Sequence, residues 1–358
     1  MLLYGVVQGK SIMRKLATIR QIDEIKAIPD ADKICAYRVD GWWVVDAIDK
    51  FKVNDPVVYI EPDAWIPHEI APFLSRGKDP SEYEGVRGER LRSIRLRGQL
   101  SQGLLIKYSE LPKAFDAFHK TRLYDPDERW FDVTDILGVK KWEAPIPAQL
   151  SGQVRGAFPS SIPKTDQERV QNLKEELKEW KAAGYTWEIT EKLDGTSMTV
   201  FLERDGRFGV CGRNWELSET AENSLWRAAR ADNIEHKLRE TGRALAIQGE
   251  LVGEGIQGNA YKLRGQQFWV YDIYDIADTR YLTAAERHQL VDAWVLRHVP
   301  VVSYYEISNT VADLLAMAEG KSALNGFAEQ EGHVYKCREN PRISFKAISN
   351  KFLMKNGG

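Results

Sequence analysis

The stretch "TEKLDGTSMTV" at residues 190–200 places Lys192 two residues before an Asp194-Gly195 step. Apolar and polar residues alternate on both sides of this step, which predicts two strands that meet there. A lysine in a strand ordinarily points toward water, and an Asp-Gly step ordinarily forms a turn. Lys192 is therefore either an ordinary turn residue or an amine held where it can attack a substrate.

Length and composition indicate a globular chain of two domains. The 358 residues exceed what a single hydrophobic core usually organises, and 43% hydrophobic with 28% charged residues is typical of globular proteins. No apolar run approaches the roughly 18 residues that a bilayer span needs, so we expect no membrane partner. The formal net charge is −2, so binding of nucleic acid has to depend on local patches.

The cysteines and the first residues of the chain indicate the cellular compartment in which we expect the protein. The three cysteines, Cys35, Cys211 and Cys337, lie far apart and form no CxxC pair. The six histidines are scattered and form no cluster with metal-ligand spacing. This pattern predicts a reducing environment and hence a cytoplasmic protein. The first dozen residues do not have the build of a signal peptide, and Met13 is an alternative start to Met1.

The chain divides into an N-terminal β-rich part and a mixed C-terminal part. Residues 13–138 contain short strand-like runs separated by turn chemistry, which predicts a small barrel. Residues 139–162 are rich in Pro, Gly and Ser and are expected to be a linker. Residues 163–358 mix strands and helices without regular alternation, so the expected fold class is α+β.

Local signals place several elements of the second domain. "TDQE" at 165–168 reads as a capping box that starts a helix running to Gly184. Asp205-Gly206 is expected to turn a hairpin, and 219–241 to be helical. "TAAE" at 283–286 is expected to cap another helix.

An arginine-rich segment, "GVRGERLRSIRLRG" at 85–98, lies in the predicted barrel. It is either a solvated edge strand or a stripe that follows the phosphates of a nucleic acid, since near-alternate arginines can line one strand face. The second interpretation is favoured because small barrels of this type often bind oligonucleotides. The candidate nucleic-acid-binding residues are Arg90, Arg92, Arg95 and Arg97.

Further motifs follow Lys192 in a characteristic order. They are "GRN" (Arg213, Asn214), "GELVGEG" (Glu250), "FWVYDIY" (Phe268 to Tyr274), "EGHVYK" (Glu331, Lys336) and "SFKAISNK" (Lys346, Lys351). A K-x-D-G match alone is weak. In this order and spacing the whole set resembles the covalent nucleotidyltransferases, the superfamily of ATP-dependent ligases and capping enzymes.

The chemistry of that superfamily accounts for these residue types. A lysine amine attacks the α-phosphorus of a nucleotide only after losing its proton, and we expect neighbouring cations and partial burial to lower the pKa of Lys192. Lys336 and Lys346 are expected to supply those cations and to grip the phosphate. Three carboxylates, Asp194, Glu250 and Glu331, are hard oxygen ligands suited to Mg²⁺ or Mn²⁺.

Domain order narrows the resemblance to one branch. The predicted barrel precedes the catalytic domain, and little chain follows Lys351. This order, with "LRSIRLRGQLSQGLL", "FPSSIPKTDQERVQN" and "EKLDGTS", resembles the fifth RNA ligase family, an N-terminal OB domain fused to a nucleotidyltransferase domain of antiparallel sheets and helices. The resemblance extends from about Met13 through nearly the whole chain. It implies an ATP-dependent RNA ligase that joins a 3′-OH to a 5′-phosphate, favouring nicks with an RNA 3′-OH end, and acting as a monomer.

The resemblance also assigns residues to the nucleotide site. Lys192 corresponds to the adenylated nucleophile and Arg169 to a contact with pyrophosphate, and we expect Phe268 to be the ring that stacks on the base. Tyr271 is left open between stacking and a place in the core. The remaining nucleotide-binding candidates are Glu191, Arg213, Asn214, Lys336, Lys346 and Lys351. The role of Lys351 is open, because many ligases end in two lysines spaced by one residue and this chain has Ser344 two residues before Lys346.

Other classes of function stay possible at this point. The barrel segment "IPDADKICAYRVDG" also resembles small tRNA-binding OB modules, so one alternative is a non-enzymatic RNA-binding protein with an inactive ligase domain. An ATP-dependent DNA ligase and a GTP-using capping enzyme are chemically close, but the domain order disfavours both. Transfer of label from ATP or GTP to the protein would separate these alternatives.

Overall fold

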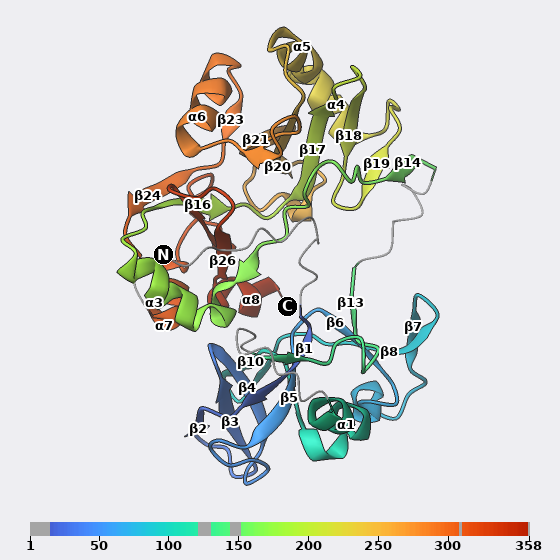
Figure 1. Cartoon of the computed structure of the whole chain (residues 1–358), viewed down its shortest axis with the longest axis vertical. Helices are drawn as coiled ribbons and strands as arrows, with labels where there is room; N and C mark the ends of the chain where they lie inside the picture. The colour runs from blue at the N-terminus through green and yellow to red at the C-terminus, as the bar shows by residue number, and fades with distance from the viewer. Residues whose placement is uncertain (1–14, 121–129, 144–151, 308–309, 357–358) are drawn as a thin grey trace. The chain divides into compact units, whose positions relative to one another are not determined.

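The computed structural model describes residues 15–120, 130–143, 152–307 and 310–356, and the alternative starts at Met1 and Met13 lie outside them. Its contacts divide the chain into two units, residues 1–144 with 353–358 and residues 145–352 (Figure 1). Among the described residues, no helix is both long and apolar enough to cross a bilayer.

The N-terminal unit is built from short antiparallel strands. They are β1 (Ala17–Gln21), β2 (Glu24–Ala27), β3 (Ile34–Val39), β4 (Trp42–Ala47), β5 (Pro56–Ile60), β6 (Ala64–Pro67), β7 (Ser81–Tyr83), β8 (Val86–Arg90), β9 (Ile94–Leu96), β10 (Gln99–Ser101), β11 (Leu104–Lys107), β12 (Phe131–Asp132) and β13 (Lys140–Lys141). Helix α1 (Pro112–Lys120) follows β11. The strand orders are β11-β5-β1-β12, β2-β3-β4, β13-β6-β8-β7 and β10-β9.

Strand β5 shows why this unit has a closed core. Val58 and Ile60 pack into one hydrophobic cluster, while Val57 and Tyr59 pack into another on the opposite face of the strand. Successive side chains of a strand point to opposite faces, so a strand buried on both faces reads as a continuous apolar run. The run "PVVYI" has this pattern, and the predicted barrel core is confirmed.

The second unit contains two sheets in the described part of the chain. The larger has the order β14-β19-β18-β17-β20-β21-β22, with β23 on β21, and the smaller has the order β15-β26-β25-β16-β24. The strands of the larger sheet are β14 (Val154–Ala157), β17 (Thr196–Leu202), β18 (Phe208–Cys211), β19 (Trp215–Leu217), β20 (Leu245–Gly253), β21 (Gln266–Asp275), β22 (Arg280–Tyr281) and β23 (Arg297–His298). Those of the smaller are β15 (Glu168–Arg169), β16 (Trp187–Lys192), β24 (Val301–Tyr305), β25 (Gly332–Cys337) and β26 (Ser344–Ile348).

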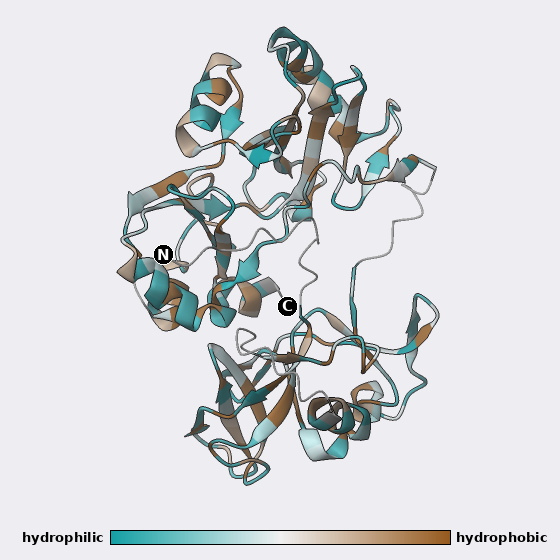
Figure 2. Cartoon of the chain, viewed as in Figure 1, coloured by the Kyte–Doolittle hydropathy of each residue, from teal (hydrophilic) through white to brown (hydrophobic). Residues whose placement is uncertain are grey.

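Helices cover the two sheets. They are α3 (Lys174–Ala182), α4 (Ser224–Ala231), α5 (Ile234–Glu240), α6 (Ala284–Ala293), α7 (Val311–Met317) and α8 (Asn350–Asn356). α4, α5 and α6 contribute to the main core beneath the larger sheet, and α3 and α7 to the core of the smaller sheet. Figure 2 shows α3 mostly in the hydrophilic colour, and Leu177 is its fully buried residue. The capping box at Thr283 and the hairpin at Asp205-Gly206 are confirmed.

Two expectations about the second unit need correction. The "TDQE" segment does not start a helix, because Glu168 and Arg169 pair with β26 and α3 begins only at Lys174. The predicted linker contains two short paired strands: β13 pairs with β6, and β14 pairs with β19. Gly156 lies in the edge strand β14, and residues 144–151, with Pro145 and Pro147, lie outside the described part.

Candidate active site

Lys192 ends β16 at the point where the chain passes from the smaller sheet to the larger one. β16 belongs to the smaller sheet, and β17 begins the larger sheet at Thr196. The turn fits because Gly195 lies against β20: an added Cβ there would meet the Leu251 carbonyl oxygen at 2.4 Å. A side chain at this position would displace the turn from β20, which explains the glycine. Lys192 is thus a residue of the junction between two sheets.

Strand register places the candidate cations on one face of the smaller sheet. Lys192 lies opposite Gly332, and Val334 of the same face lies opposite Lys346. Arg169 lies opposite Lys346 in the parallel pair of β15 and β26. Directly paired residues share a face and alternate residues return to it, so Arg169, Lys192 and Lys346 face the same side. The other face carries Trp187, Ile189, Tyr335 and Phe345, which form the core.

Three carboxylates surround the Lys192 amine. Lys192 Nζ lies 2.6 Å from Glu331 Oε2, and the Lys192 side chain is about a quarter exposed. Burial raises the pKa of Glu250 to about 8, with Lys192 opposing the rise and Glu331 and Asp194 adding to it. Burial and Glu331 likewise raise the pKa of Asp194 to about 6. Like charges packed together with one cation leave an excess of negative charge at this point.

The environment of Lys192 differs from the sequence expectation. Burial by itself lowers the pKa of Lys192, but Glu331, Glu250 and Asp194 outweigh burial and the pKa is raised. The expectation of neighbouring cations that lower this pKa is therefore wrong for the protein alone. The three carboxylates were recognised as metal ligands, but their effect on the lysine proton depends on their distances from Nζ, which sequence does not supply.

The carboxylate set fits a divalent cation. Oxygen donors from Asp194, Glu250 and Glu331 belong to the ligand class that Mg²⁺ and Mn²⁺ prefer, and their mutual repulsion is relieved when a cation binds between them. Gly195 contributes by letting the β16–β17 turn approach Glu250, whose Cγ an added Cβ would meet at 2.9 Å. The residues present therefore suit the metal that their sequence pattern predicts.

Residues 164–166, just before β15, line the site, and the sequence pattern did not predict this role. Thr165 Oγ1 accepts a hydrogen bond from Tyr271 Oη at 3.1 Å, and Asp166 pairs with Arg213 at 3.0 Å. Lys164 Nζ donates to Asn214 Oδ1 at 3.0 Å. Residues 164–166 thus meet both residues of the "GRN" motif and Tyr271. The "TDQE" pattern hid this role, because a capping box explains the same residues locally.

Phe268 does not face the site. Its ring is fully buried in the main core, and an added Cβ at Gly249 would meet its Cε2 at 2.5 Å. Phe268 lies opposite Leu251, which belongs to the same core. Further along the strand, β20 and β21 shift register between Gln248 and Gly249, and Tyr271 is the unmatched residue. A bulge puts two consecutive side chains on one face. Tyr271 and Asp272 accordingly both turn toward the smaller sheet, where each contacts Lys336.

Two further nucleotide-binding candidates lie elsewhere. The Glu191 carboxylate is on the opposite face of β16 from Lys192, and it accepts a hydrogen bond from the Ala323 amide at 2.8 Å. Lys351 is on α8 and pairs at 2.8 Å with Glu319, in the segment after α7, which packs on that opposite face. Strand alternation places Glu191 on the face away from Lys192. Lys351 lies beyond the end of β26 at Ile348 and so does not share the face of Lys346.

The arginine stripe is not a single strand face. Arg90 ends β8, where its Nη2 lies 2.5 Å from Asp63 Oδ1 and its guanidinium lies 3.8 Å from the centroid of the Trp142 ring. Arg90 is therefore a structural residue of the barrel and not a phosphate contact. Arg95 is on β9, and Arg97 forms the turn from β9 to β10. Arg92 precedes β9, so the remaining three arginines belong to one exposed hairpin.

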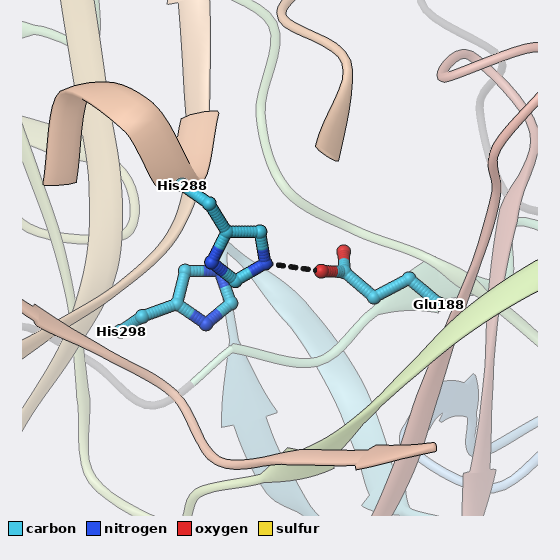
Figure 3. A group of neighbouring side chains, drawn as sticks. All are labelled: Glu188, His288 and His298. Atoms are coloured by element: carbon cyan, nitrogen blue, oxygen red, sulfur yellow. Dashed lines mark hydrogen bonds and ion pairs between the residues drawn. The ribbon is translucent and has the colours of Figure 1, made fainter. Parts of the chain in front are cut away.

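A second cluster of ionisable side chains lies beneath the site. Figure 3 shows Glu188, His288 and His298, with His288 Nε2 directed at Glu188 Oε1 at 2.6 Å. Arg287 donates to Glu188 Oε2, and its Nε lies 3.0 Å from His298 Nε2. The other nitrogen of His298 lies 2.7 Å from the Val299 carbonyl oxygen. Because a guanidinium already occupies the Glu188 and His298 lone pairs, this cluster is an ion-pair network and not a metal site.

Comparison with known proteins gives a consistent result. A family model of RNA ligases matches residues 185–348, and an OB-fold domain model matches residues 16–108. Variants of Naegleria gruberi RNA ligase solved with AMP and Mn, and with ATP and Mn, are each 46% identical, cover 96% of this chain and 100% of their own, and give TM-scores of 0.84 and 0.83. The same ligase with PPi is 46% identical over 95% of this chain and 98% of its own, with a TM-score of 0.83. A comparison with curated proteins gives no match. The OB fold and the mixed α+β ligase domain are thereby confirmed.

Proposed function

This chain belongs to the RNA ligase family, and we propose that it joins RNA ends with ATP through a covalent AMP adduct on Lys192. The observation that carries the proposal is the position of the Lys192 amine, at the junction of two sheets, 2.6 Å from Glu331 and on the same face as Lys346 and Arg169. Similarity to ligase structures that hold ATP or AMP with Mn supports ATP and a divalent metal as its cofactors.

The reaction proceeds in three transfers. The neutral amine of Lys192 attacks the α-phosphorus of ATP, a nitrogen–phosphorus bond forms, and pyrophosphate leaves with its electron pair. The AMP then passes to the 5′-phosphate of the RNA, which restores the lysine. Attack by the 3′-OH on that activated phosphate seals the strand and releases AMP. Lys346 and Arg169 contact the phosphates, where negative charge spreads over the oxygens in the transition state.

The nucleotide lies between the two sheets in this proposal. Tyr271 offers its ring to the base, held by its hydroxyl on Thr165. Arg213 and Asn214 face the ribose and phosphate side from the loop between β18 and β19. A divalent cation held by Asp194, Glu250 and Glu331 supplies positive charge that offsets the carboxylates and favours the neutral form of Lys192.

The domain order, the hairpin arginines and the cysteines support a proposal for the RNA substrate and the cellular compartment. The order of an OB domain before the ligase domain supports membership of the fifth RNA ligase family, whose substrate is a nick with an RNA 3′-OH end. Arg92, Arg95 and Arg97 on the β9–β10 hairpin contact the duplex phosphates. The free, buried cysteines at positions 35, 211 and 337 suit a reducing cytoplasm, and we propose a monomer.

Adduct formation tests this proposal. Incubation with α-labelled ATP and Mg²⁺ is expected to label the protein, whereas α-labelled GTP is not. Lys192→Ala is expected to abolish labelling. Lys351→Ala removes another lysine paired with a glutamate, in this case outside the site, and is expected to keep labelling unchanged. Acid-labile label on the Lys192→Ala protein would refute the assignment of the nucleophile.

A panel of nicked duplexes tests the substrate. RNA or DNA is placed separately on the 3′-OH side and the 5′-phosphate side of the nick, and sealing is measured at one salt concentration. We expect sealing to depend on RNA at the 3′-OH side. Equal sealing of an all-DNA nick would instead support a DNA ligase.

A further inference from the structure

Lys336 is buried between the two sheets of the ligase domain. Its side chain is 7% exposed, and its Nζ lies 2.7 Å from Asp272 Oδ1. The same ammonium donates to the backbone carbonyl of Tyr271. Two of its three donors are therefore used by β21. An ammonium has three donors and no acceptor, so at most one donor of Lys336 is left for a phosphate.

Lys336 also contacts the aromatic ring of Tyr271. Its Nζ lies 5.5 Å from the ring centroid, within the range of a cation–π interaction. The bulge in β21 turns Tyr271 and Asp272 to the same side, so one ammonium reaches the ring, the carbonyl and the neighbouring carboxylate together. With the hydroxyl bonded to Thr165, the ring is held at both ends.

We propose that Lys336 is a positioning residue for the base site: its ammonium fixes Tyr271 as the surface on which the adenine stacks, and it does not grip the phosphates of ATP. The inference rests on the proposed function, because it assumes that ATP binds on the Lys192 face. It changes the role expected for Lys336 from a phosphate contact to a support for base recognition.

A network of buried charges holds Lys336 in this position. Glu188 lies directly opposite Lys336 in the β16–β25 pair, and Arg287 lies between Glu188 and Asp272, with its Nη1 3.7 Å from Asp272 Oδ1. Two carboxylates and two cations thus balance formally beneath the site. Burial lowers the pKa of Lys336 to about 8 and Arg287 adds to the fall, while Asp272 opposes it. Asp272 therefore keeps the ammonium charged and in contact with the ring.

Other ionisable side chains also contact Glu188 and Arg287. His288 and Tyr304 both bond to Glu188, and burial with the Arg287 charge lowers the pKa of His298 to about 3. Burial tends to raise the pKa of Glu188, but His288, Arg287 and Lys336 lower it to about 2. Glu188 is thus a permanent anion at neutral pH, and it anchors Arg287 rather than moving a proton.

A double-mutant cycle on ATP affinity tests the proposal. Every variant is made in a full-length Lys192→Met background, which cannot be adenylated, and ATP binding is measured with Mg²⁺. Lys336→Met is expected to weaken ATP binding about tenfold, within the range of one lost base–aromatic stack. Tyr271→Leu is expected to weaken it by a similar factor. If Lys336 acts through the ring, the double variant binds no worse than Tyr271→Leu alone.

The opposite outcomes are equally clear. Factors that multiply in the double variant would make Lys336 an independent contact and overturn the proposal, as would unchanged affinity in Lys336→Met. Absence of ATP binding in the Lys192→Met parent would instead count against the proposed function. Lys178→Met, which removes an exposed lysine paired with Glu175 on α3, is the matched control and is expected to bind normally.

A separate control checks that each variant folds. Removing one partner of a buried ion pair can prevent folding, so melting curves accompany each variant. Lys336→Met combined with Asp272→Asn removes both charges of the pair and leaves Arg287 bonded to Glu188. If only this paired variant folds, it takes the place of Lys336→Met in the cycle, with the same expected and contradicting results.

Discussion

His298 shows how a single residue couples this fold to pH. Its ring is held neutral beside Arg287, and burial lowers its pKa to about 3 from an ordinary value near 6.5. The unfolded chain therefore binds more protons at this residue below pH 6.5, and stability falls as the pH decreases through that value. At pH 5 the loss amounts to about 2 kcal/mol from this histidine.

Urea unfolding at pH 7.5 and pH 5.0 measures this loss. His298→Gln is expected to show a smaller difference between the two pH values than the unsubstituted protein. His236→Gln is the control, because His236 is exposed on α5 and pairs only with Glu240. An equal pH difference in the His298 variant and the control would contradict the assignment of a neutral His298 in the folded protein.

The turn from β16 to β17 is the element on which the active site depends. At Gly195 an added Cβ would lie 2.4 Å from the Leu251 oxygen and 2.7 Å from Val252 Cγ1, so Gly195→Ala has to displace the turn from β20. Displacement of about 1 Å in an active site costs up to about 100-fold in rate, and we expect adenylation to fall by about tenfold or more. The rate of label transfer from α-labelled ATP measures this effect.

A glycine with free space provides the comparison at the same scale. Gly326 has no atom within 4 Å of an added Cβ and no positive φ. Gly326→Ala is expected to adenylate at the normal rate and to melt normally. A normal adenylation rate in Gly195→Ala would show that the turn tolerates movement, and that its closeness to β20 is unimportant for the chemistry.

For the whole molecule, we expect the ligase domain to carry out adenylation and the N-terminal domain to bind the duplex. The residues proposed for adenylation all belong to residues 145–352, whereas the β9–β10 hairpin belongs to the N-terminal unit. Replacing Arg92, Arg95 and Arg97 by Ala is expected to leave adenylation intact and to weaken binding to a nicked duplex. Each lost phosphate contact removes roughly 0.9 from the slope of log affinity against log salt, so the slope flattens by about 2 to 3.

Nick affinity at several salt concentrations, with a melting curve alongside, checks this division. Arg90→Ala is the comparison, because Arg90 is bonded to Asp63 and stacked on Trp142. That variant is expected to melt earlier and to keep the normal salt slope. An unchanged slope in the well-folded triple variant would mean that the hairpin does not contact the duplex.

The position of Lys192 at a strand end, its three neighbouring carboxylates and the order of an OB domain before a ligase domain were predictable from the sequence alone. Lys192, Asp194 and Gly195 are neighbours along the chain, and their pattern is local. Glu250 lies in β20 and Glu331 immediately precedes β25, and the motifs mark both positions by themselves. Such signals survive without coordinates because each depends on a short stretch of chain and on the chemistry of its residue types.

Only the tertiary structure decided which side chains meet. Phe268 and Tyr271 lie on opposite faces of β21, and the choice between them depends on which face packs into the core, where Phe268 lies opposite Leu251 of β20. Arg90 is a structural residue because Asp63 and Trp142, distant in sequence, meet it in the barrel. The proton on Lys192 is likewise held by carboxylates from three separate segments. Bulges, ion pairs and pKa shifts depend on distances between segments remote in the chain, and periodicity along one segment does not encode those distances.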